Sequence, residues 1–311
     1  MSFIREFGSY LPARVVGNEE MGARVGCDAE WIMNVSGIEE RRFAAPEETV
    51  VDLALKAAED CLQRARCEPR ELGMVMVASG SAERQFPGPA CSVANRLGLN
   101  STPAIDLPMA SAGSLFGMSL AARLASAYGN ILVLGAEKMS SIILRQPMER
   151  GVAILFGDGA GACLVASDKG MARIIDSDIH TDGTFAEDLR LEDGKPLEMN
   201  GRSVILQASR KIPRSIDDLL RKHGCEAKDI DVFLMHQANQ NLISRVAQAL
   251  GVSDARFYSN IRRFGNTSSA SMLIAAAEWA QQFGFTRGQT ACFAGFGAGF
   301  NWGALLAQGA V

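Results

Sequence analysis

An uncharged segment in the first half of the chain constrains the fold more than any other feature. Residues 107–122 contain no Asp, Glu, Lys or Arg, and most of them are Ser, Gly, Ala, Leu or Met. A helix without a charged face is typical of an element that is buried on all sides. Its serines and glycines make it a poor bilayer-spanning helix. The segment therefore predicts a central helix that the rest of the chain surrounds.

Short apolar runs alternate with helical patterns along the chain, which is the signature of α/β layering. Buried strands are expected at 73–79, 104–107, 130–135, 161–166, 172–177, 232–235, 290–294 and 303–307. Helices are expected at 49–66, 203–223, 239–250 and 267–283, in addition to the central segment at 111–127. The runs at 161–166 and 172–177 are expected to pair as neighbouring strands.

The two halves of the chain repeat one rhythm. Each half contains a helix, a strand, a second helix of small residues and closing strands, and this order predicts a structural duplication. The expected halves are residues 1–168 and 169–311. No linker or low-complexity stretch separates them, so we expect one compact unit rather than two independent domains.

Composition argues against several classes of protein. The formal net charge is −4, so the chain lacks the basic excess of a nucleic-acid-binding protein. The 7 cysteines form no CxxC pair and the 3 histidines form no pair at ligand spacing. We therefore expect free thiols in a reducing cytoplasm and no metal site. The first residues lack the pattern of a secretory signal, and the uncharged run at 288–311 has too many glycines and polar residues for a membrane span.

Ser111 is the first candidate for chemistry. It lies in DLPMASAGS (106–114), where a predicted strand ends and the central helix begins. A helix N-terminus offers free N–H groups and a dipole that favour a developing negative charge. Serine is also a preferred N-cap residue, so this segment by itself does not separate a nucleophile from a cap.

Two polar residues of the second half are candidate partners. His236 leaves the predicted strand at 232–235 and precedes a helix, which suits a general base, although a lone histidine is more often structural. Asn266 stands in GNTSSAS (265–271), where a turn with Asn as the cap of the next helix is the simplest interpretation.

Two glycine-rich segments are also distinctive. GFGAGFNWG (295–303) allows backbone N–H groups to approach a substrate closely. FGDGAG (156–161) is a similar tight segment. Neither is a phosphate-binding loop, because no Lys-Ser/Thr pair follows and no helix begins there.

Together, these segments resemble one family, in the same chain order. FGDGAGA, HQAN, GNTSxAS and GFGAGFxWG are similar to motifs of β-ketoacyl-ACP synthase III, which belongs to the thiolase superfamily. Trp31-Ile32 with GIEERR (37–42), and Phe86-Pro87 with Ala90-Cys91, extend the resemblance from about residue 9 to 309. It implies an α/β fold, the five-layered αβαβα thiolase fold made of two similar halves. It also implies a homodimer in which the loop around Phe86 reaches the partner's acyl pocket.

The resemblance implies roles for individual residues. The family's Cys-His-Asn set falls on Ser111, His236 and Asn266, so serine stands in place of the nucleophilic cysteine. The oxyanion hole would use the N–H groups of Ser111 and of the turn at Gly297 and Ala298. Acyl-CoA or an acyl carrier protein would deliver the substrate, with no further cofactor. The implied substrate contacts are Trp31, Arg150, Phe86, Gly201 and Asn239.

Two other sets of positions depart from the family. Val35 stands where an arginine often stacks on the adenine of coenzyme A. Several positions that are often basic around the tunnel are neutral, which weakens the usual docking patch for acyl carrier protein. These positions are Leu206, Asn241, Gln248 and Ala249.

Serine changes the expected mechanism. A cysteine thiol has a pKa near ~8.5 and readily becomes a thiolate at a helix N-terminus, whereas a serine hydroxyl must hand its proton to a base during attack. His236 is expected to take that proton, and Asn266 to orient it or to hold an oxyanion. An oxygen ester is a poorer electrophile than a thioester for attack by carbon. Transfer of the acyl group to an alcohol, an amine or a carrier is therefore more credible here than in a relative that uses cysteine.

Three functions stay open at this point. The first is a serine-dependent acyltransferase or condensing enzyme of a fatty-acid or polyketide-type pathway. The second is an ordinary cysteine-dependent synthase whose nucleophile has been changed to serine. The third is a non-catalytic subunit that supports a catalytic paralogue. The presence of both His236 and Asn266 argues against the third, because a silent subunit has no chemical need for either.

Overall fold

The structure is a computed structural model that describes residues 1–310. Its strands form one nine-stranded sheet in the order β11-β12-β13-β8-β1-β7-β6-β4-β5. The strands are β1 (Ser2–Tyr10), β4 (Leu72–Ala78), β5 (Ala104–Leu107), β6 (Asn130–Lys138), β7 (Asp158–Ala166), β8 (Ala172–Thr181), β11 (Val232–Met235), β12 (Thr290–Gly297) and β13 (Asn301–Gly309). Two short pairs lie outside it, β2 (Arg14–Gly17) with β3 (Glu40–Phe43) and β9 (Leu189–Arg190) with β10 (Glu198–Met199).

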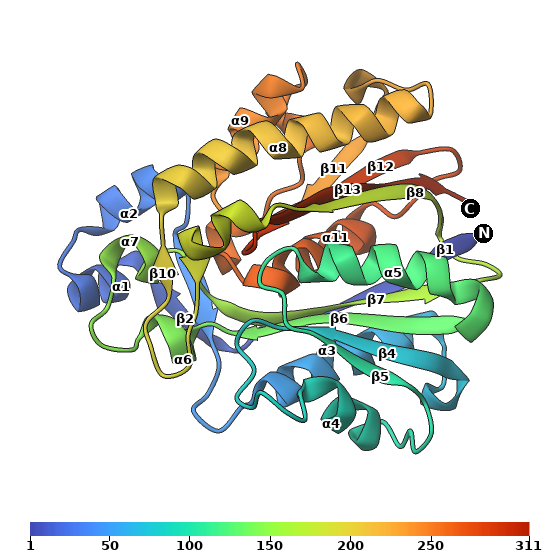
Figure 1. Ribbon diagram of the computed structural model, residues 1–311, viewed down its shortest axis with the longest axis horizontal. Coiled ribbons are helices and arrows are strands. Elements are labelled where there is room, and N and C mark those ends of the chain that lie inside the picture. The colour runs from blue at the N-terminus through green and yellow to red at the C-terminus, as the bar shows by residue number, and fades with distance from the viewer. Residues whose placement is uncertain (311) are drawn as a thin grey trace.

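The helices divide the molecule into five layers (Figure 1). The central layer contains α5 (Gly113–Tyr128) and α11 (Ser271–Gln282). The two ends of the sheet enclose these helices. Helices α3 (Val50–Ala65) and α4 (Pro89–Arg96) cover the outer side of the end that contains β4. Helices α8 (Gly201–Lys222) and α9 (Gln240–Ala249) cover the outer side of the end that contains β11. Shorter helices are α1 (Asn18–Val25), α2 (Ala29–Ser36), α6 (Ser140–Ile143), α7 (Arg150–Ala153) and α10 (Ile261–Phe264). The five-layered αβαβα prediction is confirmed.

The alternation of side chains along the strands creates these layers. In β4, Met74 and Met76 pack into the core around α5 and α11, whereas Val75 and Val77 pack against α3 and α4. Strand β11 repeats this pattern, because Leu234 faces the central core and Phe233 faces the core under α8 and α9. Successive residues of a strand point to opposite faces, so apolar residues at every position give a sheet that is covered on both sides.

The halves of the sheet are built alike. The order β4-β6-β7-β1 in one half corresponds to β11-β12-β13-β8 in the other. Strand β5, which pairs with β4, has its counterpart in an isolated parallel bridge between Phe257 and Phe233 of β11. The residues that connect β7 to β8 contain the predicted boundary at 168/169. That boundary stays a prediction.

One predicted pairing is wrong. Strands β7 and β8 do not pair with each other, because β1 lies between them and is antiparallel to both. Ile4 is opposite Val165 of β7 and Ala172 of β8. The predicted helix at 267–283 is also divided, into a 3₁₀ turn at Ser268–Ala270 and α11.

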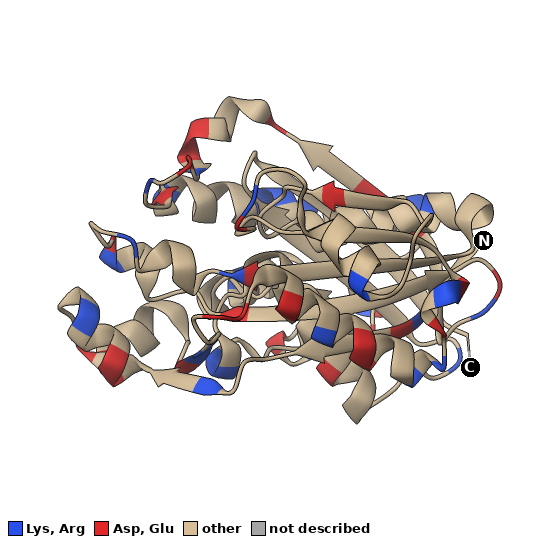
Figure 2. Cartoon of the chain, turned by 90° about the horizontal axis from the view of Figure 1, so that it is seen from below, with Lys and Arg blue, Asp and Glu red and all other residues tan. Residues whose placement is uncertain are grey.

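Charged residues lie mainly on the outer helices and loops. In the view from below, Lys and Arg are interspersed with Asp and Glu over these elements, while the long strands are largely uncharged (Figure 2). Helix α3 begins with a capping box, in which Thr49 and Asp52 each accept the other's backbone N–H. No helix among residues 1–310 has the length and apolar character needed to span a bilayer.

Candidate active site

Ser111 lies just before α5 in a strained conformation. Its φ of 64° is in the left-handed region, which non-glycine residues adopt rarely and often at functional sites. Its N–H donates to Ser268 Oγ at 3.0 Å. Gly297 at the end of β12 lies against this backbone, because a Cβ atom there would meet Ala112 N at 2.7 Å and Ser111 Cβ at 3.1 Å. A glycine at 297 is therefore required for the close approach.

His236 follows β11 and is almost fully buried. The backbone N–H of His236 donates to Ala294 O at 2.8 Å, which fixes the residue to the neighbouring strand β12. Its Nδ1 lies 2.6 Å from Ser271 Oγ. Burial lowers the pKa of His236 to about 4, although a hydrogen bond with the Ser268 backbone opposes this shift. The imidazole is therefore neutral near pH 7 and able to accept a proton.

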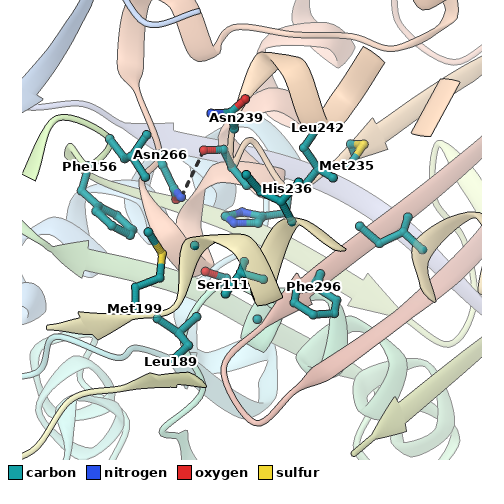
Figure 3. A pocket seen from close by; sticks show the side chains of 17 residues that line it. Ser111, Phe156, Leu189, Met199, Met235, His236, Asn239, Leu242, Asn266 and Phe296 are labelled. Carbon is teal, nitrogen blue, oxygen red and sulfur yellow. Dashed lines mark hydrogen bonds between the residues drawn. The ribbon is translucent and has the colours of Figure 1, made fainter. Parts of the chain in front are cut away.

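Asn266 is held so that it presents a donor. Its Oδ1 accepts the N–H of Ser268 at 2.8 Å, and its Nδ2 donates to Ala238 O at 3.4 Å. The latter is the dashed bond in Figure 3. Nδ2 donates only one hydrogen bond within residues 1–310, so its second N–H is available to a substrate oxygen. This geometry favours the predicted oxyanion role over the predicted role of orienting His236. Asn266 is not the cap of α11, whose N-cap is Ala270.

Two cavities meet at Ser111. The first has a volume of about 80 Å³ and is lined mainly by apolar side chains, together with Ser111, His236, Asn266, Gly297, Gly201 and Asn239. Figure 3 shows Ser111, His236 and Asn266 facing this space. The second has a volume of about 60 Å³ and includes Ile142, Leu197, Ala298 and Ser268. Ser111, Phe156 and Leu189 line both. Ser111 thus borders both spaces.

The remaining predicted substrate contacts lie outside these cavities. Trp31 and Arg150 contact each other, with the guanidinium 5.1 Å from the ring centroid, in a cation–π arrangement. Phe86 is 85% exposed and lines neither cavity. Near the first cavity, the side chains of Asn239 and Asn241 both donate to Val35 O, at 3.0 and 3.2 Å. This contact fixes the end of α2 against the start of α9.

Three residues at the site were not singled out from the sequence. Ser268 and Ser271 contact the predicted catalytic residues directly. Glu137 is fully buried at the end of β6 and accepts the N–H groups of Gly80, at 3.0 Å, and Ser269, at 3.2 Å. It thereby joins the loop after β4 to the turn that carries Ser268. Both serines belong to GNTSSAS, a motif whose Asn alone was assigned a role.

No cysteine lines either cavity in the described chain. Burial raises the pKa of Cys61 and Cys163, and raises that of Cys292 to about 12. Because the thiolate is the reactive form of cysteine, these thiols are unsuited to replace Ser111 as the nucleophile.

Comparison with known proteins decides the family. Models described as 3-oxoacyl-[acyl-carrier-protein] synthase III and its C-terminal part match residues 105–183 and 220–308. A β-ketoacyl-[acyl-carrier-protein] synthase III from Vibrio parahaemolyticus is 36% identical over 310 residues, which cover 97% of each chain. The chain belongs to the β-ketoacyl-ACP synthase III family.

Solved structures agree with this assignment. The synthase III from Aquifex aeolicus superimposes with a TM-score of 0.94 at 31% identity, over 99% of this chain and 100% of that one. The priming β-ketosynthase of the R1128 polyketide pathway gives a TM-score of 0.91 at 30% identity, over 99% and 96%. Like other members of the synthase III family, the protein has the thiolase fold and is an acyl-transferring condensing enzyme.

Proposed function

We propose that this synthase III relative takes an acyl group from acyl-CoA or an acyl carrier protein onto Ser111 Oγ and passes it to a second substrate. The observation that carries the proposal is the place of Ser111 where two cavities meet. Both cavities are bounded mainly by apolar side chains, and the first also contains the polar groups of His236 and Asn266. An acyl chain suits the second, and the thioester arm and the acceptor suit the first.

The first half-reaction forms an oxygen ester. Ser111 Oγ attacks the thioester carbonyl carbon, and His236 accepts the hydroxyl proton through Nε2, since Nδ1 is engaged with Ser271. The carbonyl electron pair moves onto oxygen. When this oxyanion collapses, the C–S bond breaks and the departing thiolate takes the proton from His236. Trp31 and Arg150 are proposed to contact the nucleotide end of coenzyme A.

The second half-reaction consumes the ester. The acceptor enters the cavity where the Asn266 Nδ2–H can stabilise negative charge on a carbonyl oxygen. A carbon nucleophile from a decarboxylated malonyl thioester would give a β-ketoacyl product, and an alcohol, an amine or a carrier thiol would give simple acyl transfer. With an alcohol, an amine or a thiol, the acyl C–O bond breaks and the acceptor's own proton passes through His236 to Ser111. With the carbon nucleophile, CO₂ leaves, the acyl C–O bond breaks, and the proton for Ser111 comes from water through His236.

An acyl carrier protein is proposed to dock along α8. Leu206 is exposed, but Arg202 and Arg210 stand one turn before and one turn after it and are also exposed. Residues four apart share one face of a helix. Neither arginine forms an ion pair within residues 1–310, whereas Arg214, Arg221 and Lys222 in the C-terminal half of α8 all do. Arg202 and Arg210 can therefore bind an acidic partner in spite of the neutral residue at 206.

A homodimer is proposed through β5. This strand pairs with β4 on one side only and forms an edge of the sheet. Ile105 on β5 is 40% exposed, and Phe86 projects from the loop after β4. Unpaired edge strands with exposed apolar residues are ready templates for pairing with another chain.

The Ser111→Cys variant tests the proposed function against the alternative of a cysteine-dependent synthase whose nucleophile has been changed to serine. Acyl-enzyme and β-ketoacyl product are measured separately for both proteins, with an acyl-CoA as donor and malonyl-ACP as acceptor. If the site is adapted to serine, both proteins form an acyl-enzyme and the variant gains no large condensation activity. Strong condensation by the cysteine form, with neither acylation nor condensation by the serine form, would instead indicate an ordinary synthase disabled by substitution.

A further inference from the structure

Ser268 contacts all three residues of the predicted catalytic set. Its N–H donates to Asn266 Oδ1 at 2.8 Å, and its Oγ accepts the N–H of Ser111 at 3.0 Å. Its backbone lies close enough to the His236 imidazole to oppose the lowering of the histidine pKa by burial. The residue is 1% exposed, and its φ of 46° is left-handed. A buried serine in this conformation, with these contacts, indicates a function rather than a turn of low energy.

The hydroxyl hydrogen of Ser268 is not committed to a protein acceptor. The oxygen accepts from Ser111, but no hydrogen bond donated by this hydroxyl occurs within residues 1–310. Buried polar groups are normally paired, and a serine hydroxyl can accept and donate at the same time. Ser268 lines the second cavity together with Ser111. The uncommitted hydrogen is therefore available to a group that is bound in this cavity.

This hydroxyl lies beside the predicted nucleophile, 3.0 Å from the Ser111 backbone nitrogen. An acyl carbonyl oxygen attached at Ser111 is stabilised by donors near the nucleophile, including the backbone N–H of Ser111 itself. That N–H points at Ser268 Oγ. Because this N–H is already donated to Ser268 Oγ, an oxyanion on this side of Ser111 would be met by the hydrogen of the Ser268 hydroxyl.

We propose that Ser268 is a further catalytic residue, whose hydroxyl donates a hydrogen bond to the oxyanion formed during acylation of the residue at 111. The proposal rests on the proposed function. No proton is transferred by Ser268: the proton of the nucleophile goes to His236 and then to the leaving thiolate. The hydroxyl stabilises the oxygen that holds the carbonyl electron pair until the C–S bond breaks.

The experiment compares Ser268→Ala with Ser268→Gly. Both remove the hydroxyl, but glycine adopts a left-handed φ without strain and alanine does not. Acylation is followed by rapid-quench mass spectrometry with acetyl-CoA and butyryl-CoA, in the protein with Ser111 and in the Ser111→Cys protein. We expect both substitutions to lower the maximal acylation rate by about 100-fold or more with the half-saturating donor concentration unchanged, as for loss of an oxyanion donor.

Ser269→Ala is the matched control. Ser269 Oγ donates to Ala78 O at 2.9 Å and lines neither cavity, so this change removes a neighbouring buried hydroxyl without touching the reacting atoms. Thermal unfolding of all three variants monitors stability. The control should acylate at the rate of the parent protein.

The results separate this inference from the proposed function. Normal acylation by both Ser268 variants would overturn the inference, and so would a slow alanine variant beside a normal glycine variant, because only backbone conformation would then matter. A protein that is never acylated with serine at 111 would overturn the proposed function, while the Ser111→Cys series would still test Ser268. If the cysteine form also fails to acylate, both proposals are wrong.

Discussion

The Nδ1 atom of His236 lies 2.6 Å from the Oγ atom of Ser271, which also accepts the N–H of Gln237 at 3.0 Å. Ser271 is the first residue of α11 and is almost fully buried. The contact fixes the plane of the imidazole and leaves Nε2 as the nitrogen available to the nucleophile. When the Nδ1–H group donates to Ser271, Nε2 keeps the lone pair that a general base needs.

Loss of the Ser271 hydroxyl should therefore slow acylation. Ser271→Ala removes the partner of Nδ1 and lets the ring turn, and we expect the acylation rate to fall by about 10-fold or more, within the range for general base catalysis. Ser271→Thr keeps a hydroxyl and should recover most of the rate. The measurement is single-turnover acylation with saturating acyl-CoA. Equal rates for the alanine and natural proteins would show that the contact does not position the base.

The acylation rate should be nearly independent of pH from 5.5 to 8. Burial holds the pKa of His236 at about 4, below its ordinary value, so the imidazole loses its base function only when the pH falls toward 4. The Ser111→Cys variant should behave differently, because its rate rises with the thiolate fraction as the pH rises. The pH dependence of single-turnover acylation checks both expectations. A tenfold fall per pH unit beginning near 6.5 in the serine protein would contradict a buried neutral base.

Charge reversal on α8 should affect only the carrier-bound substrate. In the double variant Arg202→Glu/Arg210→Glu, repulsion of an acidic carrier should raise the half-saturating concentration of acyl-ACP by about 10-fold or more, since each rim charge contributes mainly to association. Acylation by acyl-CoA should be unchanged. Arg221→Glu, at the far end of the same helix, is the matched control. Equal loss with both donors would show damage to the site rather than to docking.

A charge on the edge strand should disrupt the proposed dimer. Ile105→Lys places an ammonium group on the exposed face of β5, and a lysine on an edge strand blocks pairing with a second chain. We expect the natural protein to have the mass of a dimer in light scattering after gel filtration, and the variant that of a monomer. A natural protein that is monomeric at micromolar concentration would refute the β5 interface.

Much of the fold follows from side-chain periodicity, and the failures have physical causes. Strands such as β4 are apolar at nearly every position, so they are evident in the sequence. Strand β1 is not, because Arg5 and Glu6 stand in its middle. They are tolerated there because Arg5 donates to Ala65 O and Glu6 accepts the N–H of Phe7. Without β1, the segments at 161–166 and 172–177 looked like neighbours.

The site shows a similar division. Ser111, His236 and Asn266 were predicted from motifs, and the structure brings them to one cavity. The roles of Ser268 and Ser271 could not be predicted, because the direction of each serine in GNTSSAS depends on a 3₁₀ turn whose first residue, Ser268, is left-handed. No helical or strand period describes such a turn.

The most direct test of the account is to locate the acyl group. The protein is incubated with a panel of acyl-CoAs, its intact mass is recorded, and the modified peptide is sequenced, with Ser111→Ala and His236→Ala as controls. The account predicts an increase by one acyl group, carried on Ser111 as an ester, absent from the alanine variant at 111 and formed at least about 100-fold more slowly without His236. An adduct on any of the cysteines, or no adduct with any donor, would contradict it.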